Sequence, residues 1–360
     1  MSKFHPLRIA RVDRETRDAV AITFAVPDEL GDLYRFEPGQ HLTVRATIDG
    51  ADVRRSYSIC AAPRDGTLRI AVKRCPGGMF STYANERIAV GDTLEVMPPL
   101  GHFGVAADPG AARHHVAFAA GSGITPVLSI VKATLEAEPR SQFTLFYGNR
   151  ASASVMFREE LAALKDLYLS RFNLVHVLSR ESQDIDLLHG RIDAERADAL
   201  LRHWAPVDEI DVIYLCGPDA MMHAVRGLLE ARGVPAAQIR IERFASSIPR
   251  HEHKPAVLPQ GCPTQSEVTV ILDGAKRSFT LDRTKESILE AGLAHGIEMP
   301  YSCKGGVCAT CRCRVVEGEI DMDANFALED YEVARGFVLA CQSYPASDRV
   351  TVDFDQTGTG

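Results

Sequence analysis

The chain has 360 residues, 46% of them hydrophobic and 24% charged, and its formal net charge is −8. This length predicts two or three globular domains with apolar cores of ordinary size. An acidic chain without a basic block excludes nucleic acid as the main partner. An acidic surface instead attracts a basic protein partner.

The N-terminus and the cysteine usage indicate where the protein works. Residues 1–8 carry charges where a secretory signal needs an apolar core, and no run approaches the ~20 apolar residues of a membrane helix. Nine cysteines in a chain of this size are too sparse for a disulfide framework. We therefore expect a soluble, cytoplasmic protein.

Residues 1–106 show a series of short segments rich in β-branched residues, separated by Gly, Pro and Asp turns. Many short strands at regular spacing predict an antiparallel β-barrel, interrupted by one helix over residues 80–86. The expected strands cover residues 7–12, 19–25, 41–48, 55–60, 67–74 and 93–97.

The pattern changes near residue 113, where strands begin to alternate with helices. This alternation predicts an α/β domain with a parallel sheet over residues 107–245. The expected strands cover residues 115–120, 143–147, 172–178, 211–216 and 239–244, and the expected helices cover 126–136, 157–165, 194–201 and 220–231.

Residues 246–265 contain four prolines, two histidines and little apolar periodicity. This composition predicts a linker between domains, and an ordered loop packed on the body is the alternative. A linker would let the last domain visit two sites in turn, which is a hypothesis from composition alone.

Residues 266–360 restart with a hairpin that turns at Asp273-Gly274. Its order of elements predicts an α+β domain of the β-grasp ferredoxin type, so the whole chain is expected to be multidomain. The expected strands cover 268–272, 277–281, 312–316 and 349–354, and the expected helices cover 287–295 and 328–334.

Four cysteines in this last domain have the spacing of metal ligands. Three of them follow the pattern C-x4-C-x2-C, and the fourth comes after 29 further residues. This is the plant-type 2Fe–2S pattern, whereas structural zinc, the alternative, favours paired C-x2-C knuckles. The expected cluster ligands are Cys303, Cys308, Cys311 and Cys341. The roles of Cys262 and Cys313 stay open.

Two elements of the predicted barrel suit a flavin. Arg55 and Tyr57 share one face of a strand, where a guanidinium can hold a phosphate and a phenol can cover the ring, and Ser58 can bond a flavin nitrogen. A strand, a Gly turn and a helix start follow, and backbone N–H groups there can bind an anion. Either element alone has an ordinary structural explanation. The expected contacts of the second are Val72, Lys73, Gly78, Met79, Ser81 and Thr82.

A nicotinamide site is predicted in the α/β domain. The turn containing Gly121, Gly123 and Thr125 follows a buried strand and opens a helix, as phosphate-binding turns do. Cys216-Gly217-Pro218 ends a later strand, and ligands bind at such strand ends. The candidates for catalytic residues are Ser58, Thr125 and Cys216.

Charge at two other strand ends favours NADPH over NADH. Arg150 follows the second strand of this domain, and Ser179-Arg180 follows the third. A 2′-phosphate is bound by arginine, whereas a ribose diol is bound by an acid. Each arginine alone is more simply explained as a solvated loop residue.

With these motifs the chain resembles ferredoxin-NADP reductase-like modules fused to a plant-type ferredoxin. The resemblance implies FAD rather than FMN, NADPH, and a 2Fe–2S cluster, and it gives Phe244 as a candidate cover for the flavin. The segments Cys303–Cys311, 338–342 and 352–355 resemble more narrowly the reductase subunits of phenylacetyl-CoA epoxidases.

The narrower resemblance implies an electron path from NADPH through FAD and the 2Fe–2S cluster to a multicomponent oxygenase. The expected partner is a di-iron epoxidase of aerobic phenylacetate degradation. The reductase of a Rieske-type ring or steroid hydroxylase is the alternative. A redox sensor or electron store without a dedicated oxygenase is a further alternative from another functional class.

Overall fold

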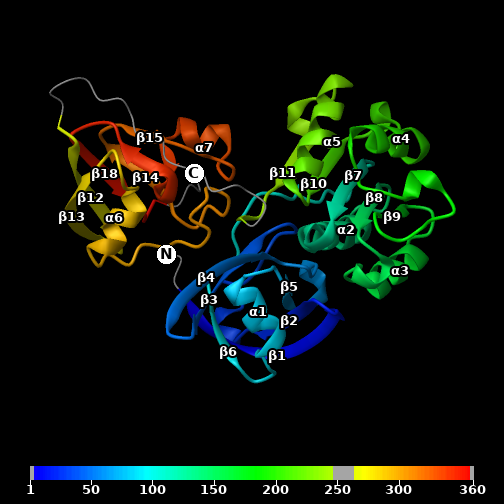
Figure 1. Cartoon of the computed structure of the whole chain (residues 1–360), viewed down its shortest axis with the longest axis horizontal. Helices are drawn as coiled ribbons and strands as arrows, with labels where there is room; N and C mark the ends of the chain where they lie inside the picture. The colour runs from blue at the N-terminus through cyan, green and yellow to red at the C-terminus, as the bar shows by residue number, and fades with distance from the viewer. Residues whose placement is uncertain (1–3, 246–262, 357–360) are drawn as a thin grey trace. The chain divides into compact units, whose positions relative to one another are not determined.

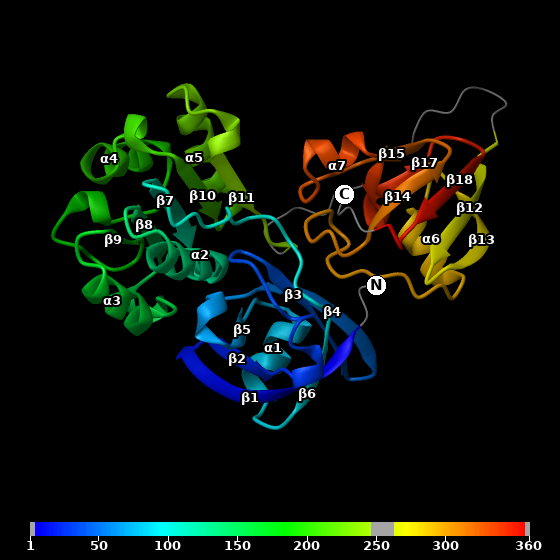
Figure 2. The same ribbon diagram turned by 180° about the vertical axis from the view of Figure 1, so that it is seen from behind.

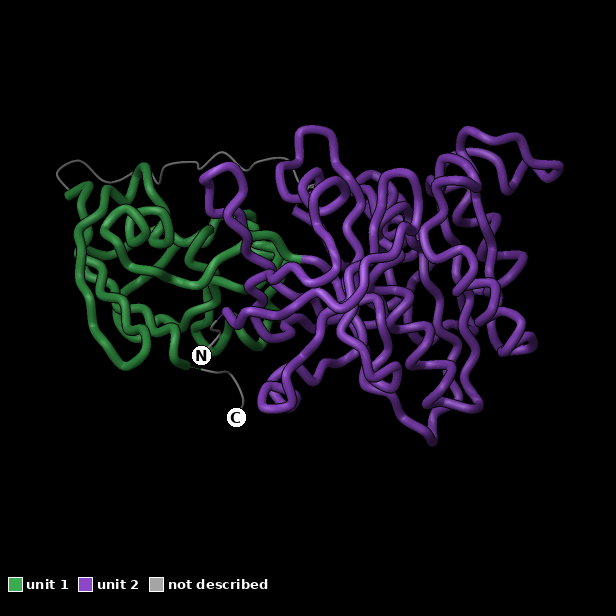
Figure 3. The backbone as a smooth tube through the Cα atoms, turned by 90° about the horizontal axis from the view of Figure 1, so that it is seen from below, with its two compact units in different colours: residues 1–3, 54–56, 248–360 green, residues 4–53, 57–247 purple. Residues whose placement is uncertain are grey.

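The computed structural model describes residues 4–245 and 263–356. Figure 3 shows the chain divided into two compact units. Of the described residues, the larger unit holds 4–53 and 57–245, and the smaller holds 263–356 with 54–56. The predicted linker lies outside the described residues as far as residue 262, and a strand already begins at Gln265.

The flavin-type domain is a six-stranded barrel, as predicted. Its strands are hydrogen-bonded in the order β4-β3-β6-β1-β2-β5, and a bridge between Ile59 and Ile70 joins the end of β4 to β5. One helix, α1 (Met79–Glu86), packs beside them (Figure 1). The strands are β1 (His5–Thr16), β2 (Ala19–Ala25), β3 (His41–Ile48), β4 (Ala51–Ser58), β5 (Leu68–Lys73) and β6 (Thr93–Val96).

The fourth strand begins earlier than predicted. The sequence predicts a strand over 55–60, but β4 starts at Ala51, directly after a turn at Asp49-Gly50. Both turn residues have positive φ, 50° and 83°, which suits a tight two-residue hairpin. The hairpin fixes the register of β4, and therefore which face Arg55 and Tyr57 share.

The nucleotide-type domain has a five-stranded parallel sheet in the order β11-β10-β7-β8-β9. Helices α2 and α3 pack on one face and α4 and α5 on the other (Figures 1 and 2). The strands are β7 (His114–Ala120), β8 (Gln142–Asn149), β9 (Phe172–Leu178), β10 (Val212–Cys216) and β11 (Ile239–Glu242), and the helices are α2 (Ile124–Ala137), α3 (Arg158–Leu167), α4 (Ala194–Trp204) and α5 (Asp219–Ala231).

The strand order of this sheet creates a crevice. The chain leaves β7 toward β8 on one side and later returns to β10 on the other side. Loops that depart in opposite directions leave an opening at the carboxyl ends of β7 and β10, and ligands of parallel sheets bind at such a switch point. The predicted nicotinamide turns follow these two strands.

The ferredoxin-type domain has a mixed sheet in the order β13-β12-β18-β14-β16, with β12 and β18 parallel. The predicted turn at Asp273-Gly274 is confirmed, and the Asp355 carboxylate accepts both of its N–H groups at 2.9 and 2.7 Å. The elements are β12 (Gln265–Leu272), β13 (Ala275–Asp282), α6 (Ile288–Ala294), β14 (Arg312–Glu317), β15 (Ile320–Met322), α7 (Asp330–Ala334), β16 (Phe337–Leu339), β17 (Ser343–Pro345) and β18 (Arg349–Asp353).

Among the residues that the structure describes, no helix combines the length and the apolar character needed to cross a membrane.

Candidate functional site

The two predicted flavin elements meet in the barrel. The ring of Tyr57 on β4 packs on that of Phe80 in α1, with centroids 5.5 Å apart. Arg55 lies two residues earlier on the same strand and is exposed. Its guanidinium donates to the Arg54 carbonyl at 2.7 Å. The strand therefore presents a cation and a half-buried phenol on one face, as predicted for a flavin and its phosphates.

Ser58 ends β4 with a buried hydroxyl. Its side-chain oxygen has no hydrogen-bond partner among the described residues, and the residue is 3% exposed. Buried polar atoms in folded proteins nearly always find a partner, because leaving one unpaired costs about 1–3 kcal/mol. The hydroxyl thus fits a ligand that brings its own polar edge, such as an isoalloxazine ring.

The glycine turn before α1 is held by Ser81. The Ser81 hydroxyl accepts the Cys75 N–H at 3.1 Å and donates to the Gly78 carbonyl at 3.1 Å. A Cβ on Gly78 would lie 2.5 Å from this oxygen, so the turn needs glycine there. Ser81 therefore shapes the anion-binding turn, while Met79 is exposed and Thr82 is half-buried beside it.

The strand before this turn carries two further predicted contacts, Val72 and Lys73. Val72 is fully buried in the barrel core, and its carbonyl accepts from the Asn85 amide at 3.1 Å. Lys73 is half-buried and lies 4.0 Å from Asp18. The Val72 side chain therefore faces the core, and the predicted contact of this residue with the cofactor stays a prediction.

The phosphate-type turn sits at the switch point of the parallel sheet. It forms the short helix η3 (Gly121–Gly123) directly after β7, and it lies beside β5 of the barrel. A Cβ on Gly123 would lie 2.0 Å from the Cys216 carbonyl, so the ends of β7 and β10 approach closely only with glycine. Thr125 is buried and donates to the Ser122 carbonyl at 3.0 Å.

Cys216 lies at the end of β10 with no exposed surface. Burial and the nearby charge of Glu242 raise the pKa of its thiol well above the usual value, so the thiol stays protonated. Gly217 and Pro218 follow and lead into α5. Phe244 comes two residues after β11. It is partly buried and packs against the hydrophobic core that includes Cys216.

The arginines predicted to select NADPH are neighbours. The Arg180 N–H donates to the Arg150 carbonyl at 2.7 Å, and the Ser179 N–H donates to the Asn149 carbonyl at 2.9 Å. Both arginines are exposed. The next acid, Glu181, already accepts from the Ser152 N–H and hydroxyl, which lower its pKa.

Asn149 is a candidate that sequence reasoning missed. It ends β8 at the carboxyl edge of the sheet and is 8% exposed, and its amide group makes no well-formed hydrogen bond in the described part of the chain, although it lies beside the Tyr147 side chain. Nearby, the Tyr147 hydroxyl donates to the Gly121 carbonyl at 2.9 Å. The position of an amide between a strand end and Arg150 was the available signal.

The four predicted cluster ligands converge in one loop and one separate segment. Cys303 interacts with both Cys308 and Cys341, and Cys341 interacts with Cys311. The Gly305 N–H donates to the Cys303 sulfur at 3.3 Å, and the Gly306 N–H points to Cys341. Such N–H groups offset the negative charge of a thiolate-bound cluster.

The loop backbone is shaped for this arrangement. Lys304, Gly306 and Ala309 all have positive φ, and a Cβ on Gly306 would lie 2.9 Å from the Ala324 carbonyl. The positive φ angles therefore let the loop fold tightly around the four sulfurs.

The described residues contain no group of three or more His, Cys, Asp or Glu side chains that could hold a single metal ion. A 2Fe–2S cluster requires only two thiolates per iron, with sulfide completing each coordination sphere. Of the two cysteines left open, Cys313 is buried in the domain core, and Cys262 lies outside the described residues.

Comparison with known families confirms the order of the three kinds of domain. Residues 6–104 match the oxidoreductase FAD-binding domain, residues 118–227 the oxidoreductase NAD-binding domain, and residues 270–346 the 2Fe-2S iron-sulfur cluster binding domain. The three matches fall in the predicted order, and the predicted domain ends stay predictions. The chain is thus an oxidoreductase with FAD and 2Fe–2S modules.

Relatives match over the full length. The chain is 49% identical to the E subunit of 1,2-phenylacetyl-CoA epoxidase from Escherichia coli (strain K12), over 99% of both chains. It is 36% identical to a 3-ketosteroid-9-alpha-monooxygenase ferredoxin reductase component of Rhodococcus rhodochrous, over 97% of this chain and 96% of that one. The structure of phthalate dioxygenase reductase matches 98% of both chains, with 26% identity and a TM-score of 0.58. The chain therefore belongs to the family of three-module oxygenase reductases that includes this component of 1,2-phenylacetyl-CoA epoxidase.

Proposed function

We propose that this chain is the reductase component of a di-iron phenylacetyl-CoA epoxidase and delivers electrons from NADPH to it. The observation that carries the proposal is the 49% identity to a component of the Escherichia coli epoxidase, which extends over 99% of both chains. When bound, FAD accepts a hydride and releases electrons singly, and the 2Fe–2S cluster carries one electron at a time.

The residues of the chain have the binding roles in this proposal. Arg55 and the turn at Gly78 hold the flavin phosphates, while Tyr57 covers the ring and the unpaired Ser58 hydroxyl meets its polar edge. The four cysteines hold the cluster. Dinucleotide phosphates bind at the turn of η3, where backbone N–H groups and the start of α2 favour an anion.

NADPH is favoured over NADH by the charge at the strand ends. A backbone hydrogen bond links Arg150 and Arg180, and both side chains are exposed. Two guanidinium groups are therefore available to bind a 2′-phosphate. The nearby carboxylate of Glu181 is occupied by Ser152 and is poorly available for a ribose diol.

The charge of the ferredoxin-type domain supports a protein acceptor. Residues 266–356 hold 16 acidic side chains and nine basic ones, so they carry seven of the eight net negative charges. A surface of this sign attracts a basic docking face on an oxygenase. The cluster thiols and the remaining free cysteines suit a reducing compartment, and we place the protein in the cytoplasm.

Reconstitution with purified oxygenases tests the proposal. We expect NADPH-driven epoxidation when the chain is mixed with di-iron epoxidase subunits, at a rate at least tenfold above that with NADH, because a charge-assisted contact is worth about 1.5–3 kcal/mol. A Rieske-type oxygenase is the second acceptor to test, since a steroid monooxygenase reductase is 36% identical. Turnover with the Rieske enzyme alone would contradict the epoxidase assignment. If NADPH is oxidised neither with these two oxygenases nor with ferricyanide, the chain lacks turnover, and a redox sensor would be favoured.

A further inference from the structure

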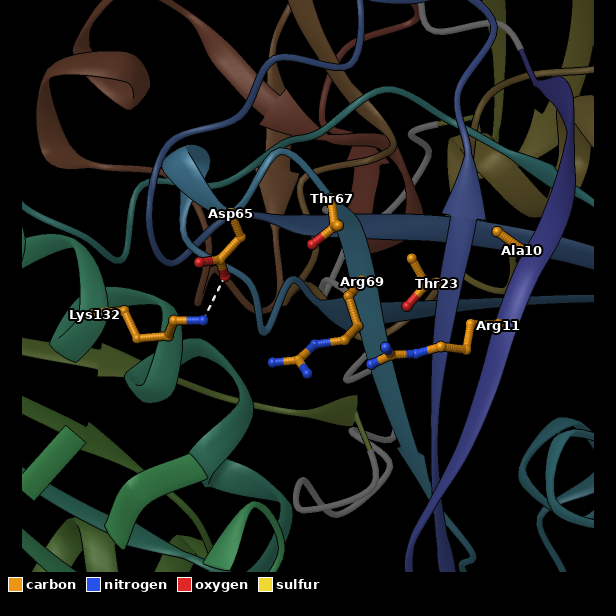
Figure 4. A pocket seen from close by; sticks show the side chains of 7 residues that line it. All are labelled: Ala10, Arg11, Thr23, Asp65, Thr67, Arg69 and Lys132. Carbon is orange, nitrogen blue, oxygen red and sulfur yellow. Dashed lines mark hydrogen bonds and ion pairs between the residues drawn. The ribbon is translucent and has the colours of Figure 1, made fainter. Parts of the chain in front are cut away.

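A cavity of about 500 Å³ lies where the barrel meets the nucleotide domain, and the proposed function does not use it. Figure 4 shows the Arg69 guanidinium and the Lys132 ammonium extending into this region from β5 and α2. The cavity is lined by Ala10, Arg11, Thr23, Asp65, Thr67, Arg69 and Lys132. Three cations in a cavity suggest an anion site at first sight.

The cations of the cavity are already paired. Arg69 donates to Glu160 of α3 at 2.8 Å, Lys132 donates to Glu160 at 2.8 Å and also to Asp65, and Arg11 pairs with Asp13. Each positive charge therefore has a carboxylate beside it. A free anion would have to displace these carboxylates, so the cavity is not a good anion site.

The ion pairs instead join the two domains. Arg69 on β5 and Asp65 in the short helix η2 (Pro63–Asp65) belong to the barrel, whereas Lys132 and Glu160 belong to the nucleotide domain. The Arg69 side chain is only 12% exposed and that of Lys132 only 17%. Pairs shielded to this degree are screened less than surface pairs. We call these four residues the joint cluster.

Two hydrogen bonds beside the joint cluster cross the same boundary. The Ser129 hydroxyl of α2 donates to the Ala61 carbonyl at 2.6 Å, where both groups are buried. The Phe157 N–H, at the start of α3, donates to the Glu15 carboxylate of β1 at 3.1 Å. The boundary is therefore held at α2 and at the start of α3.

Phe157 shows how tightly the start of α3 is held. It adopts φ 57°, a left-handed conformation that is rare for a bulky residue, and the residue is 2% exposed. The Arg69 guanidinium carbon lies 5.3 Å from the centre of this ring. A residue keeps such a backbone only when its surroundings fix it, and here Glu15 and Arg69 of the barrel do so.

The segment that is held in this way begins at the nicotinamide crevice. β8 ends at Asn149, and the chain then passes through Arg150 and the short helix η4 (Ser152–Ser154) to Phe157 and Glu160. A shift of Glu160 away from the barrel would therefore carry the proposed NADPH-binding residues with it. The joint cluster and the crevice are two ends of one short segment.

We propose that Glu160, held by Arg69 and Lys132, is a positioning residue that sets the distance between the nicotinamide and flavin rings. The proposal rests on the hydride-transfer function. In that reaction a hydride with its two electrons leaves the nicotinamide and is accepted at the flavin, with one further proton from water. Hydride transfer is steeply sensitive to placement, and an error of about 1 Å can cost about 100-fold in rate.

The test compares Glu160→Gln with Asp13→Asn in the holoenzyme. Both changes remove the carboxylate of an ion pair at the cavity, but Asp13 pairs with Arg11 of the same strand and does not cross the boundary. We expect Glu160→Gln to slow flavin reduction by NADPH about 10- to 100-fold in stopped flow, with a larger primary deuterium isotope effect. Asp13→Asn should leave the rate of flavin reduction and its isotope effect unchanged.

Two measurements that do not depend on turnover accompany the kinetics. Amide hydrogen exchange over residues 150–160 should be faster in Glu160→Gln than in the wild type. The Kd of NADP+ should change less than about threefold, because the dinucleotide still binds its own domain. Arg69→Gln removes the same bridge from the barrel side and serves as the second variant if Glu160→Gln loses flavin.

Three outcomes would overturn the positioning role. The first is that Glu160→Gln reduces its flavin as fast as the wild type. The second is that Asp13→Asn slows flavin reduction equally. The third is that weaker NADP+ binding explains the whole loss of rate. Failure of the proposed function looks different, because the wild-type flavin would then not be reduced by NADPH or NADH at all. The double variant Arg69→Gln/Glu160→Gln should be slowed by less than the product of the two single effects, since the two changes share one contact.

Discussion

Two buried polar groups without partners mark where the cofactors are expected. The Ser58 hydroxyl and the Asn149 amide are both more than nine-tenths buried and unpaired among the described residues. By contrast, the buried Ser81 and Ser129 hydroxyls each donate to a backbone carbonyl. Unpaired groups cost stability, and we propose that ligands complete these two, at the barrel strand end and at the sheet edge.

Arg180 is the residue at which the proposed preference for NADPH can be tested. Arg180→Ala removes one guanidinium from the expected 2′-phosphate contact, and a charged hydrogen bond contributes about 1.5–3 kcal/mol. We therefore expect kcat/KM for NADPH to fall about 10- to 100-fold while that for NADH stays the same. Ferricyanide reduction measures both constants.

The matched control for Arg180 is Arg202→Ala. Arg202 is also exposed and pairs with Asp198 on α4, away from the strand ends that face the crevice. Arg202→Ala should leave kcat/KM unchanged for both NADPH and NADH. An equal loss for NADPH and NADH in Arg180→Ala would contradict a 2′-phosphate contact and indicate a role common to both dinucleotides.

At the scale of elements, the close approach of β7 and β10 depends on Gly123. Gly123→Ala places a Cβ 2.0 Å from the Cys216 carbonyl, and the backbone must shift to accommodate it. We expect a loss of about 1–3 kcal/mol in stability. Dinucleotide binding should weaken as well, because the crevice changes shape. Thermal unfolding and NADP+ titration measure the two effects.

Gly227 provides the contrast within the same domain. It lies inside α5, and a Cβ there would meet no heavy atom within 4 Å. Gly227→Ala should therefore raise stability by about 0.5–1 kcal/mol through the lower backbone entropy of the unfolded chain, without affecting NADP+. If the two variants have the same stability and the same affinity for NADP+, the close contact between Gly123 and the Cys216 carbonyl does not exist in solution.

The sequence predicted the elements with strong local signals. The alternation of strands and helices between residues 113 and 245 gave the parallel sheet, and the Asp273-Gly274 turn gave the first ferredoxin hairpin. The three-residue strands β15, β16 and β17 were missed, since so short a segment has no measurable periodicity. The left-handed Phe157 was unpredictable because distant barrel residues impose it.

The same limit applies to the sites. Each cofactor site was predicted from short motifs, such as the three cysteines from Cys303 to Cys311. The joint cluster was not found, because Arg69 and Glu160 are 91 positions apart and neither belongs to a motif. Ion pairs between domains are specified by packing, which a single sequence does not reveal.

At the scale of the molecule, charge is divided unevenly along the chain. Residues 266–356 carry seven of the eight net negative charges, so the reductase part is nearly neutral. Electrostatic steering of one protein by another raises association rates by about 10- to 1,000-fold and depends on ionic strength. The ferredoxin-type domain should therefore determine how salt affects electron delivery.

We expect the second-order rate of electron transfer to the oxygenase to fall at least tenfold as salt rises, because the Debye length shrinks from about 10 Å at 0.1 M to about 3 Å at 1 M. Stopped-flow oxidation of the prereduced protein by the oxygenase measures this rate. Cluster reduction at saturating NADPH is the control, since it is intramolecular and involves no encounter between proteins. A delivery rate that is independent of salt, or that rises with it, would mean that the acidic domain does not steer the partner and that docking depends on apolar contacts.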